Sequence, residues 1–338
     1  MTPEALAGMI VVIAIVAYAV LGGADFGGGI WSLFSWGERA EDQRDSLEHA
    51  IGPVWETNHV WLILVVVALF TVFPAAYAAI FTALYLPLFL ALIGICARGA
   101  AFAFRHYGGH GNRLGRASLR FFSGASILTP FTFGLVVGAV TGGKIEADGA
   151  DVLSGAWAGW LEPFALMCGL IGLLICAFVG AAFMVPRTGG ELQRDFRRRA
   201  IVASLALGAA TTATIPIAHA NAPEFAEHLG DAEVLVAMAL TAATGTVTLL
   251  ALWRGATRVI PLLAGATVTA VIVSWALAQR PYLLAPDITL ESAAAEDLTV
   301  VSFLIALPLG SLILVPSLLF LYWTFSRDRF AAGDEGGR

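Results

Sequence analysis

Apolar runs of about twenty residues follow one another along nearly the whole chain, and no other feature constrains the fold as much. The hydrocarbon core of a bilayer needs about 20 residues per helix. Only 13% of the residues are charged, against about 25% in an ordinary soluble domain. The sequence therefore predicts an all-α polytopic membrane protein with nine transmembrane helices, at about residues 5–35, 51–73, 77–104, 119–141, 160–185, 200–220, 233–253, 259–279 and 299–325.

The positions of the basic residues test this count. The odd-numbered loops and the C-terminal segment carry nearly all the loop arginines, whereas the even-numbered loops carry only Lys144 and Arg280. Cytoplasmic loops are enriched in lysine and arginine. We therefore expect the odd-numbered loops and the C-terminus to be cytoplasmic and the N-terminus to lie outside. A miscounted helix would have scrambled this alternation.

The chain reads as one membrane unit, without a sequence repeat, a low-complexity linker or a soluble domain. We expect a single transmembrane domain over residues 1–330 and a short disordered cytoplasmic tail over 331–338. The first apolar run lacks a basic start and a cleavage signal, so it is predicted to be a retained helix. The longest outer loop, 280–298, is expected to carry a short surface helix. The net charge of −6 and the lack of a basic tract argue against a nucleic-acid partner.

Two carboxylates lie well inside predicted spans, Asp25 in the first and Glu56 in the second. These spans form an antiparallel hairpin around a cytoplasmic loop at 37–50, and a rise of 1.5 Å per residue places both acids in the inner half of the bilayer. An ionisable group there costs roughly 2.5–3.5 kcal/mol on insertion scales, so it normally faces protein or a water path. Without a basic partner at their depth, the acids are expected to exchange protons with the cytoplasm. The alternative is that they are hydrogen-bonded groups that fasten helices together.

Asp25 stands in a glycine-rich segment, Gly22–Gly29, in which five of eight residues are glycine. Such a segment lets another helix backbone approach closely, or lets water pass beside a thinned helix. Close packing is the commoner role of glycines in membranes. It does not explain an aspartate among them.

The second span begins with a polar cluster. Glu56 and His59 share one helical face, while Trp55, Asn58 and Trp61 share another. We expect His59 to be a hydrogen-bonding partner of Glu56, with a haem or metal ligand as the alternative. The tryptophans are either aromatics of the membrane interface or part of a functional surface.

The histidines and cysteines give little support to a metal centre in this chain. Only His59 and His219 lie within predicted spans, and they lie near opposite faces. A bis-histidine haem needs two ligands at one level, so this chain alone is not expected to hold one. No paired His/carboxylate spacing of the metal-binding kind occurs. Three scattered cysteines, Cys96, Cys168 and Cys176, are expected to be packing residues.

Arg98 is a charge near the end of the third predicted span. The first interpretation is that its long side chain reaches back to the inner membrane surface. The second is that it pairs with a carboxylate of the first hairpin or with a partner subunit.

At these residues the chain resembles subunit II of the cytochrome bd-type quinol oxidases. The resemblance covers essentially the whole chain, in the family's order and spacing, and it is carried by Gly22–Gly29 with Trp31, Gly52–Trp61, Phe70–Tyr77, Arg98–Arg105 and Arg280–Tyr282. The string Gly-Pro-Val-Trp-acid-x-Asn-x-Val-Trp at 52–61 is its most specific part.

The resemblance implies a fold and a role. Members have two four-helix bundles plus a peripheral helix, paired pseudo-symmetrically with a related subunit I. The complex is an electrogenic quinol:oxygen oxidoreductase of the bacterial cytoplasmic (inner) membrane that reduces dioxygen to water with protons from the cytoplasm. Two haems b and a haem d belong to subunit I, so this chain is expected to be haem-free and to perform no catalysis alone. Small single-helix accessory subunits, and a structural quinone bound to this subunit, occur in some members.

The resemblance also implies residue roles. Acids that match Asp25 and Glu56 line a proton route towards the haems at the subunit interface, and His59 stands beside Glu56. The tryptophan that matches Trp61 is associated with oxygen access from the lipid. The oxygen route or the subunit interface is therefore predicted to include Trp55, Asn58, Trp61 and Arg98.

The chain departs from the family at one place, because several members carry aspartate where it has Glu56 and glycine where it has Thr57. The longer acid shifts the expected water network but keeps a carboxylate. A rival function from sequence physics alone is a proton-coupled secondary transporter with its site near the Asp25/Glu56 hairpin. A transporter should show internal repeats, which this chain lacks. A third alternative is a purely structural membrane partner with incidental acids.

Overall fold

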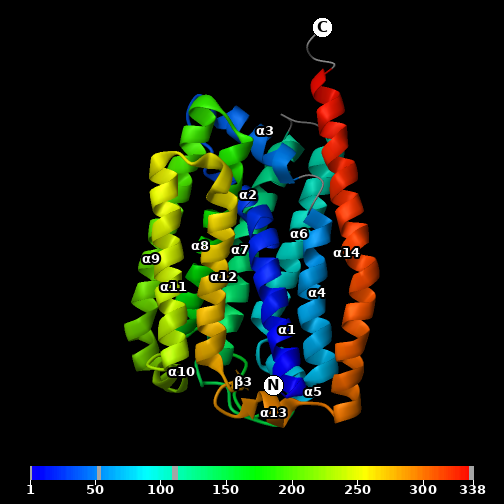
Figure 1. Ribbon diagram of the computed structural model, residues 1–338, viewed down its shortest axis with the longest axis vertical. Helices are drawn as coiled ribbons and strands as arrows, with labels where there is room; N and C mark the ends of the chain where they lie inside the picture. The colour runs from blue at the N-terminus through cyan, green and yellow to red at the C-terminus, as the bar shows by residue number, and fades with distance from the viewer. Residues whose placement is uncertain (1, 52–54, 109–112, 335–338) are drawn as a thin grey trace.

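The computed structural model describes residues 2–51, 55–108 and 113–334, and it is almost entirely helical (Figure 1). Within these residues, seven helices are long and apolar enough to cross a membrane, or eight if a helix pair bent by 119° counts as one span. The all-α, multi-pass membrane fold is thereby confirmed. The count of nine spans stays a prediction.

The first span changes its winding in the middle. α1 (Pro3–Ala17), capped at its start by Thr2, passes into a π-helical turn, η1 (Tyr18–Gly22), and then into α2 (Gly23–Leu33). The π-helical turn leads directly into the glycine-rich segment that carries Asp25. Such turns are frequent at functional sites.

The connection at 37–50 was predicted as a loop, but it is largely a helix, α3 (Ala40–Ile51). α3 is amphipathic. Leu47 is fully buried, whereas Glu41 and Asp42 are exposed. A search for long apolar runs misses such a helix, because only one narrow face of it is apolar.

A sharp bend follows the second span. α4 (Trp55–Val72) ends just before Phe73, and α5 (Pro74–Ala83) starts at an angle of 119° to it. The bend has a simple cause, since the residue before a proline avoids the α region, and Phe73 has φ −126° and ψ 58°. The prediction of a third span at 77–104 is therefore wrong at its start, because the upright helix begins only with α6 (Tyr85–Gly108).

The remaining long helices follow in an up-and-down order (Figure 1). They are α7 (Arg113–Thr141), α8 (Pro163–Met184), α9 (Gly190–Asn221), α11 (Ala232–Arg254), α12 (Ile260–Gln279) and α14 (Asp297–Asp334). Short elements join them: β1 (Ala147–Asp148), β2 (Asp151–Val152), η2 (Val185–Arg187), α10 (Pro223–His228), η3 (Thr257–Val259), β3 (Tyr282–Leu284), β4 (Ile288–Thr289) and α13 (Leu290–Ala293).

Two of the sequence expectations concern the last connection and the tail. The loop at 280–298 carries the expected short helix, α13, preceded by the antiparallel β3–β4 pair. α14 continues to Asp334, so helix extends into the segment 331–338 that was expected to be a disordered tail. The last four positions, 335–338, lie outside the described residues.

The helices pack around two buried apolar clusters. One joins α1, α4, α5 and α7 and includes Phe73 and Leu84. The other joins α2, α8, α9 and α12 and includes Phe178 and Phe196. α14 lies at the edge of the molecule beside α4 (Figure 1), with most of its described side chains exposed.

Glycines bring α2 and α8 into backbone contact. A Cβ atom added to Gly27 would lie 2.1 Å from the carbonyl oxygen of Cys176 and 2.7 Å from the Cα of Gly180. A Cβ atom on Gly180 would lie 2.6 Å from the Cα of Gly27. The close-packing role of these glycines is thus confirmed, and it fixes the helix that presents Asp25.

Candidate functional site

A buried ion pair joins α2 to α6. The guanidinium of Arg98 donates to both carboxylate oxygens of Asp25, with Nη1–Oδ2 at 2.7 Å and Nη2–Oδ1 at 2.6 Å. Nη2 also donates to the backbone carbonyl of Asp25 at 3.0 Å, and Nε donates to Ser126 Oγ of α7 at 3.2 Å. The two charged side chains are only 3% and 5% exposed. One guanidinium therefore holds three helices together.

Two aromatic rings enclose this guanidinium. The Cζ atom of Arg98 lies 4.7 Å from the ring centroid of Phe26 and 4.9 Å from that of Phe122. A desolvated cation over aromatic faces gains about 2 kcal/mol or more. The rings also keep water away, so removal of either charge would leave the other one buried and uncompensated.

This geometry corrects two sequence-based expectations. Arg98 does not reach back to the membrane surface, and its second interpretation, a pair with a carboxylate of the first hairpin, is confirmed. The premise that Asp25 has no basic partner at its depth is wrong. Both carboxylate oxygens of Asp25 are bonded by Arg98, so Asp25 is well placed to orient neighbouring groups.

The π-helical turn η1 gives α4 a point of attachment. The carbonyl of Leu21, inside this turn, accepts a hydrogen bond from Nδ2 of Asn58 at 3.2 Å. Asn58 is 2% exposed. Among the described residues, its Oδ1 is buried and has no hydrogen-bond partner. Natural proteins usually match such an atom with an ordered water.

His59 lies next to Tyr18, a residue of the same π-helical turn. The two ring centroids are 6.1 Å apart and the rings meet edge to face at 64°. The Tyr18 ring also makes edge contacts with Phe26, at 6.3 Å, and with Phe133, at 5.9 Å. Through Phe26, this aromatic group reaches the ion pair.

The remaining predicted residues of the second span are placed only in part. Trp61 is half-buried on α4. The side chains of Trp55 and Glu56 lie outside the described part of the structure, although both residues belong to α4. The predicted hydrogen bond between His59 and Glu56 thus stays a prediction.

A second polar cluster, which sequence reasoning missed, anchors α3 to the start of α9. Arg39 donates from Nε and Nη2 to the carboxylate of Asp195, both at 3.1 Å, and Gln43 donates to the same carboxylate at 3.0 Å. Arg199 donates to Oε1 of Gln43 at 2.6 Å and to the Phe34 carbonyl at 3.0 Å. The hydrogen bond to Asp195 raises the pKa of the Arg39 guanidinium above its ordinary value. In the sequence, the arginines of this cluster were informative only about topology, because they helped to assign their loops to the cytoplasm.

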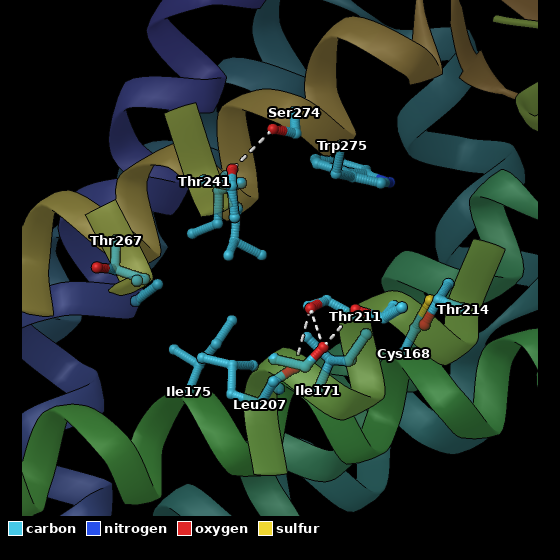
Figure 2. A pocket seen from close by; sticks show the side chains of 18 of the residues that line it. Cys168, Ile171, Ile175, Leu207, Thr211, Thr214, Thr241, Thr267, Ser274 and Trp275 are labelled. Carbon is cyan, nitrogen blue, oxygen red and sulfur yellow. Dashed lines mark hydrogen bonds between the residues drawn. The ribbon is translucent and has the colours of Figure 1, made fainter. Parts of the chain in front are cut away.

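A large cavity lies in the half of the molecule that holds α8, α9, α11 and α12 (Figure 2). Its volume is about 1160 Å³. Its wall is mostly apolar, with a few hydroxyls, among them Thr241 and Ser274, which hydrogen-bond each other at 3.1 Å. Tyr18 and Gly23 also line it, so the cavity extends to the helix that carries the ion pair. Nothing in the sequence pattern marks it.

The cavity is partly open, and exposed residues of two helices contribute to its wall. Gly208 and Thr212 of α9 line it, as do Ala242 and Thr246 of α11, and all four are also exposed. Water does not favour an apolar wall. An apolar molecule from the membrane suits the space.

Among the described residues, no group of three or more histidine, cysteine, aspartate or glutamate side chains could hold a metal ion. His59 stands near the start of α4, at the end where α3 lies, whereas His219 stands near the end of α9, beside α10. The two therefore cannot be the axial ligands of one haem.

Fold and site together define a class: a multi-pass helical membrane protein with a buried internal ion pair and a large apolar cavity. Comparison with known proteins narrows this class. The family model described as cytochrome bd terminal oxidase subunit II matches residues 3–325. The chain therefore belongs to the cytochrome bd terminal oxidase subunit II family.

Individual relatives agree with this assignment. The chain is 30% identical over 193 residues to cytochrome bd ubiquinol oxidase subunit 2 of Bacillus subtilis (strain 168), over 57% of this chain and 56% of that protein. It is 28% identical over 205 residues to cytochrome bd-I ubiquinol oxidase subunit 2 of Escherichia coli (strain K12), over 58% of this chain and 52% of that protein. These matches span about half the length of the relatives.

A solved structure has the same fold. A chain in the structure of bd oxidase from Geobacillus thermodenitrificans superimposes with a TM-score of 0.73, covering 96% of this chain and 99% of that one. At 21% identity this likeness concerns the fold alone.

Proposed function

We propose that this chain is the haem-free subunit of a quinol oxidase complex in a bacterial cytoplasmic membrane. It pairs with a haem-bearing subunit I, and the complex oxidises quinol and reduces dioxygen to water. The observation that carries the proposal is the family match over residues 3–325. The two haems b and the haem d belong to subunit I, which is consistent with the lack of paired histidines at one depth in the spans of this sequence. The family match does not favour the transporter alternative.

The chain's own contribution is a proton path on the hairpin of the first two spans, formed by Asp25, Glu56 and His59. Glu56 is the proton carrier. Asp25 is held by Arg98 in a buried ion pair, and the pair holds the path in place and orients its water. Asn58 supports this role, because its buried Oδ1 offers an acceptor next to His59.

Membrane topology follows from the same assignment. We propose nine crossings, with α4 and α6 added to the seven helices that are long and apolar enough by themselves. The start of α1 and the end of α14 lie at opposite ends of the molecule (Figure 1), as an odd number of crossings requires. The N-terminus lies outside and the C-terminus in the cytoplasm.

Two surfaces of the chain serve partners. Ile63, Val67 and Phe70 are exposed apolar side chains of α4, and they supply a face for subunit I or for oxygen access, together with Trp55, Trp61 and neighbouring lipid. The cavity beside α9 and α11 is large and apolar enough to hold a structural quinone. Small single-helix accessory subunits can cover exposed helices such as α14.

The test of the proton-carrier role is Glu56→Gln in the assembled complex. Quinol-dependent oxygen consumption should fall by about 10²-fold or more, since a positioned proton donor contributes typically 10²–10⁴-fold. The haem absorption spectrum should remain unchanged. The matched control is Glu56→Asp, which keeps the carboxylate and should retain most of the rate.

Two results would contradict the proposal. Near-normal oxygen consumption by the Glu56→Gln complex, with intact haems, would remove the proton role. A chain that takes up substrate when reconstituted alone would replace the oxidase with a transporter.

A further inference from the structure

The turns that join α8 to α9 and α11 to α12 are strongly basic. They contact each other at the end of the molecule where α3 lies (Figure 1). Together they contain seven arginines and two acids, over residues 185–200 and 253–262. Both acids are already held in ion pairs, one with Arg194 and one with Arg39. The turns therefore keep a positive charge that no carboxylate within them offsets.

Arg197 of α9 brings the charges of the two turns together. Its Nη1 atom lies so close to Gly255, the C-cap residue of α11, that a Cβ atom added there would be 3.2 Å from it. Arg198 follows Arg197 and Arg254 precedes Gly255, so arginines of two helices lie close together. The enrichment of arginine in cytoplasmic loops explains their presence, but it does not require them to converge. Like charges that converge repel one another, and a bound anion removes this repulsion.

Exposed apolar side chains continue from these arginines along both helices. Val202 lies four residues after Arg198 on α9, so the two share a helical face. Leu250 lies four residues before Arg254 on α11, and Trp253 is exposed beside them. α9 and α11 pack against each other. The α9/α11 surface, as we define it, consists of Arg197, Arg198, Val202, Leu250, Trp253 and Arg254, and none of these residues lines the cavity.

The place of this surface in the molecule narrows the choice of partner. α9 and α11 lie at the edge opposite α14 and α4 (Figure 1), and α4 supplies the face proposed for subunit I. We propose that the α9/α11 surface binds an anionic phospholipid of the cytoplasmic leaflet. Its phosphate lies among the arginines, because a guanidinium donates two parallel hydrogen bonds to phosphate oxygens, and its acyl chains lie along the two apolar helix faces. From the proposed function, this inference takes only the cytoplasmic side of this end.

The test uses the complete complex with subunit I, washed free of lipid in detergent. Dioleoyl phosphatidylglycerol is added in steps, and its binding is measured as the rise in the unfolding temperature of the complex, since a ligand of the folded state stabilises it. Dioleoyl phosphatidylcholine has the same acyl chains and no net charge. Roughly tenfold more of this neutral lipid should be needed for the same rise, because several arginines act on the anionic head group.

Two arginine variants assign the effect to the α9/α11 surface. In Arg198→Gln and in Arg254→Gln, the affinity for phosphatidylglycerol should fall roughly fivefold, and the weaker affinity for phosphatidylcholine should stay the same. Both arginines are exposed, so both variants should fold. The matched control is Arg120→Gln, which removes an exposed arginine near the start of α7 and should keep the wild-type affinity for both lipids.

Several results would overturn the proposal. Equal binding of the two lipids is one, and wild-type affinity for phosphatidylglycerol in both arginine variants is another. Inorganic phosphate that stabilises the complex as well as the lipid does would show a site for a free ion. A wild-type complex that dimerises, where Arg254→Gln does not, would show that a second copy covers this face. Quinol-dependent oxygen consumption of the same wild-type preparation tests the proposed function separately, so a complex without oxidase activity would leave the lipid result standing.

Discussion

At the scale of single residues, the pair of Asp25 and Arg98 shows how a membrane protein keeps a charge in its interior. Burial of two ions is costly, and close geometry with extra hydrogen bonds offsets the cost. Here the guanidinium satisfies two carboxylate oxygens, a backbone carbonyl and a serine, and it lies between two aromatic rings. The pair therefore behaves as a unit.

A double-mutant series tests this unit. Asp25→Ala and Arg98→Ala should each lower the free energy of unfolding by about 3–5 kcal/mol, because each leaves an uncompensated buried charge. The double variant Asp25→Leu/Arg98→Met should recover much of that loss, since no charge is left. The measurement is the thermal unfolding of the purified complex. Additive losses in the double variant would show that the two residues act separately.

Part of this site is predictable from the sequence. Pairing of Arg98 with a carboxylate of the first hairpin was one of its two interpretations. In the structure, Arg98 lies ten residues before the end of α6 and Asp25 eight before the end of α2, so their depths are similar. Depth alone does not show that α2 and α6 are neighbours. Whether two helices are neighbours depends on packing between residues that are far apart in the chain. The cavity is less predictable still, because it is space left between four helices, and no pattern in their apolar stretches marks it.

At the scale of helices, backbone contact between α2 and α8 sets the position of the ion pair. Gly27→Ala should be destabilising by roughly 1–3 kcal/mol, a typical overpacking cost, since its Cβ would lie 2.1 Å from the Cys176 carbonyl. Gly124→Ala on α7 is the matched control, because its Cβ meets nothing within 4 Å. That control should be neutral or slightly stabilising. Equal thermal stabilities of the two variants would contradict the contact.

α3 is held by side-chain hydrogen bonds, with the buried apolar Leu47 as a secondary contact. Arg199→Ala should loosen α3, since Arg199 bonds both Gln43 and the Phe34 carbonyl and lies over the Trp31 ring at 5.3 Å. A hydrogen bond to a charged group contributes about 1.5–3 kcal/mol.

Limited trypsin digestion of the complex measures this loosening. Cleavage after Arg44 should speed up in Arg199→Ala and stay at the wild-type rate in Arg198→Ala, whose side chain is exposed. Unchanged cleavage in both variants would mean that Arg199 does not hold α3.

At the scale of the whole molecule, sequence and structure agree on the fold class. They differ where an apolar segment does not belong to a helix that crosses the membrane upright. The segment 77–83 is as apolar as the helices around it, so hydropathy merges it with the third span. In the structure, α5 ends at Ala83, and Leu84, with φ −109° and ψ 25°, separates it from α6. Hydropathy measures the free energy of transfer into lipid, and it carries no information on how a helix is oriented relative to the membrane.

This difference makes α4 and α6 the decisive spans for topology. Alkaline phosphatase, active only outside the cytoplasm, can be fused after Gly37, Leu84, Gly143 or Gly189. Nine crossings predict phosphatase activity for the fusions after Leu84 and Gly143 and none for those after Gly37 and Gly189. Fluorescent-protein fusions at the same positions should show the opposite pattern, with fluorescence only after Gly37 and Gly189. If neither α4 nor α6 crossed the membrane, the fusions after Gly37, Gly143 and Gly189 would keep the same alkaline phosphatase activity. Only the fusion after Leu84 would change, from active to inactive. An inactive Leu84 fusion would therefore reduce the number of spans to seven and move Glu56 out of the membrane interior. The same measurement thus tests both the nine-span topology and the proton path.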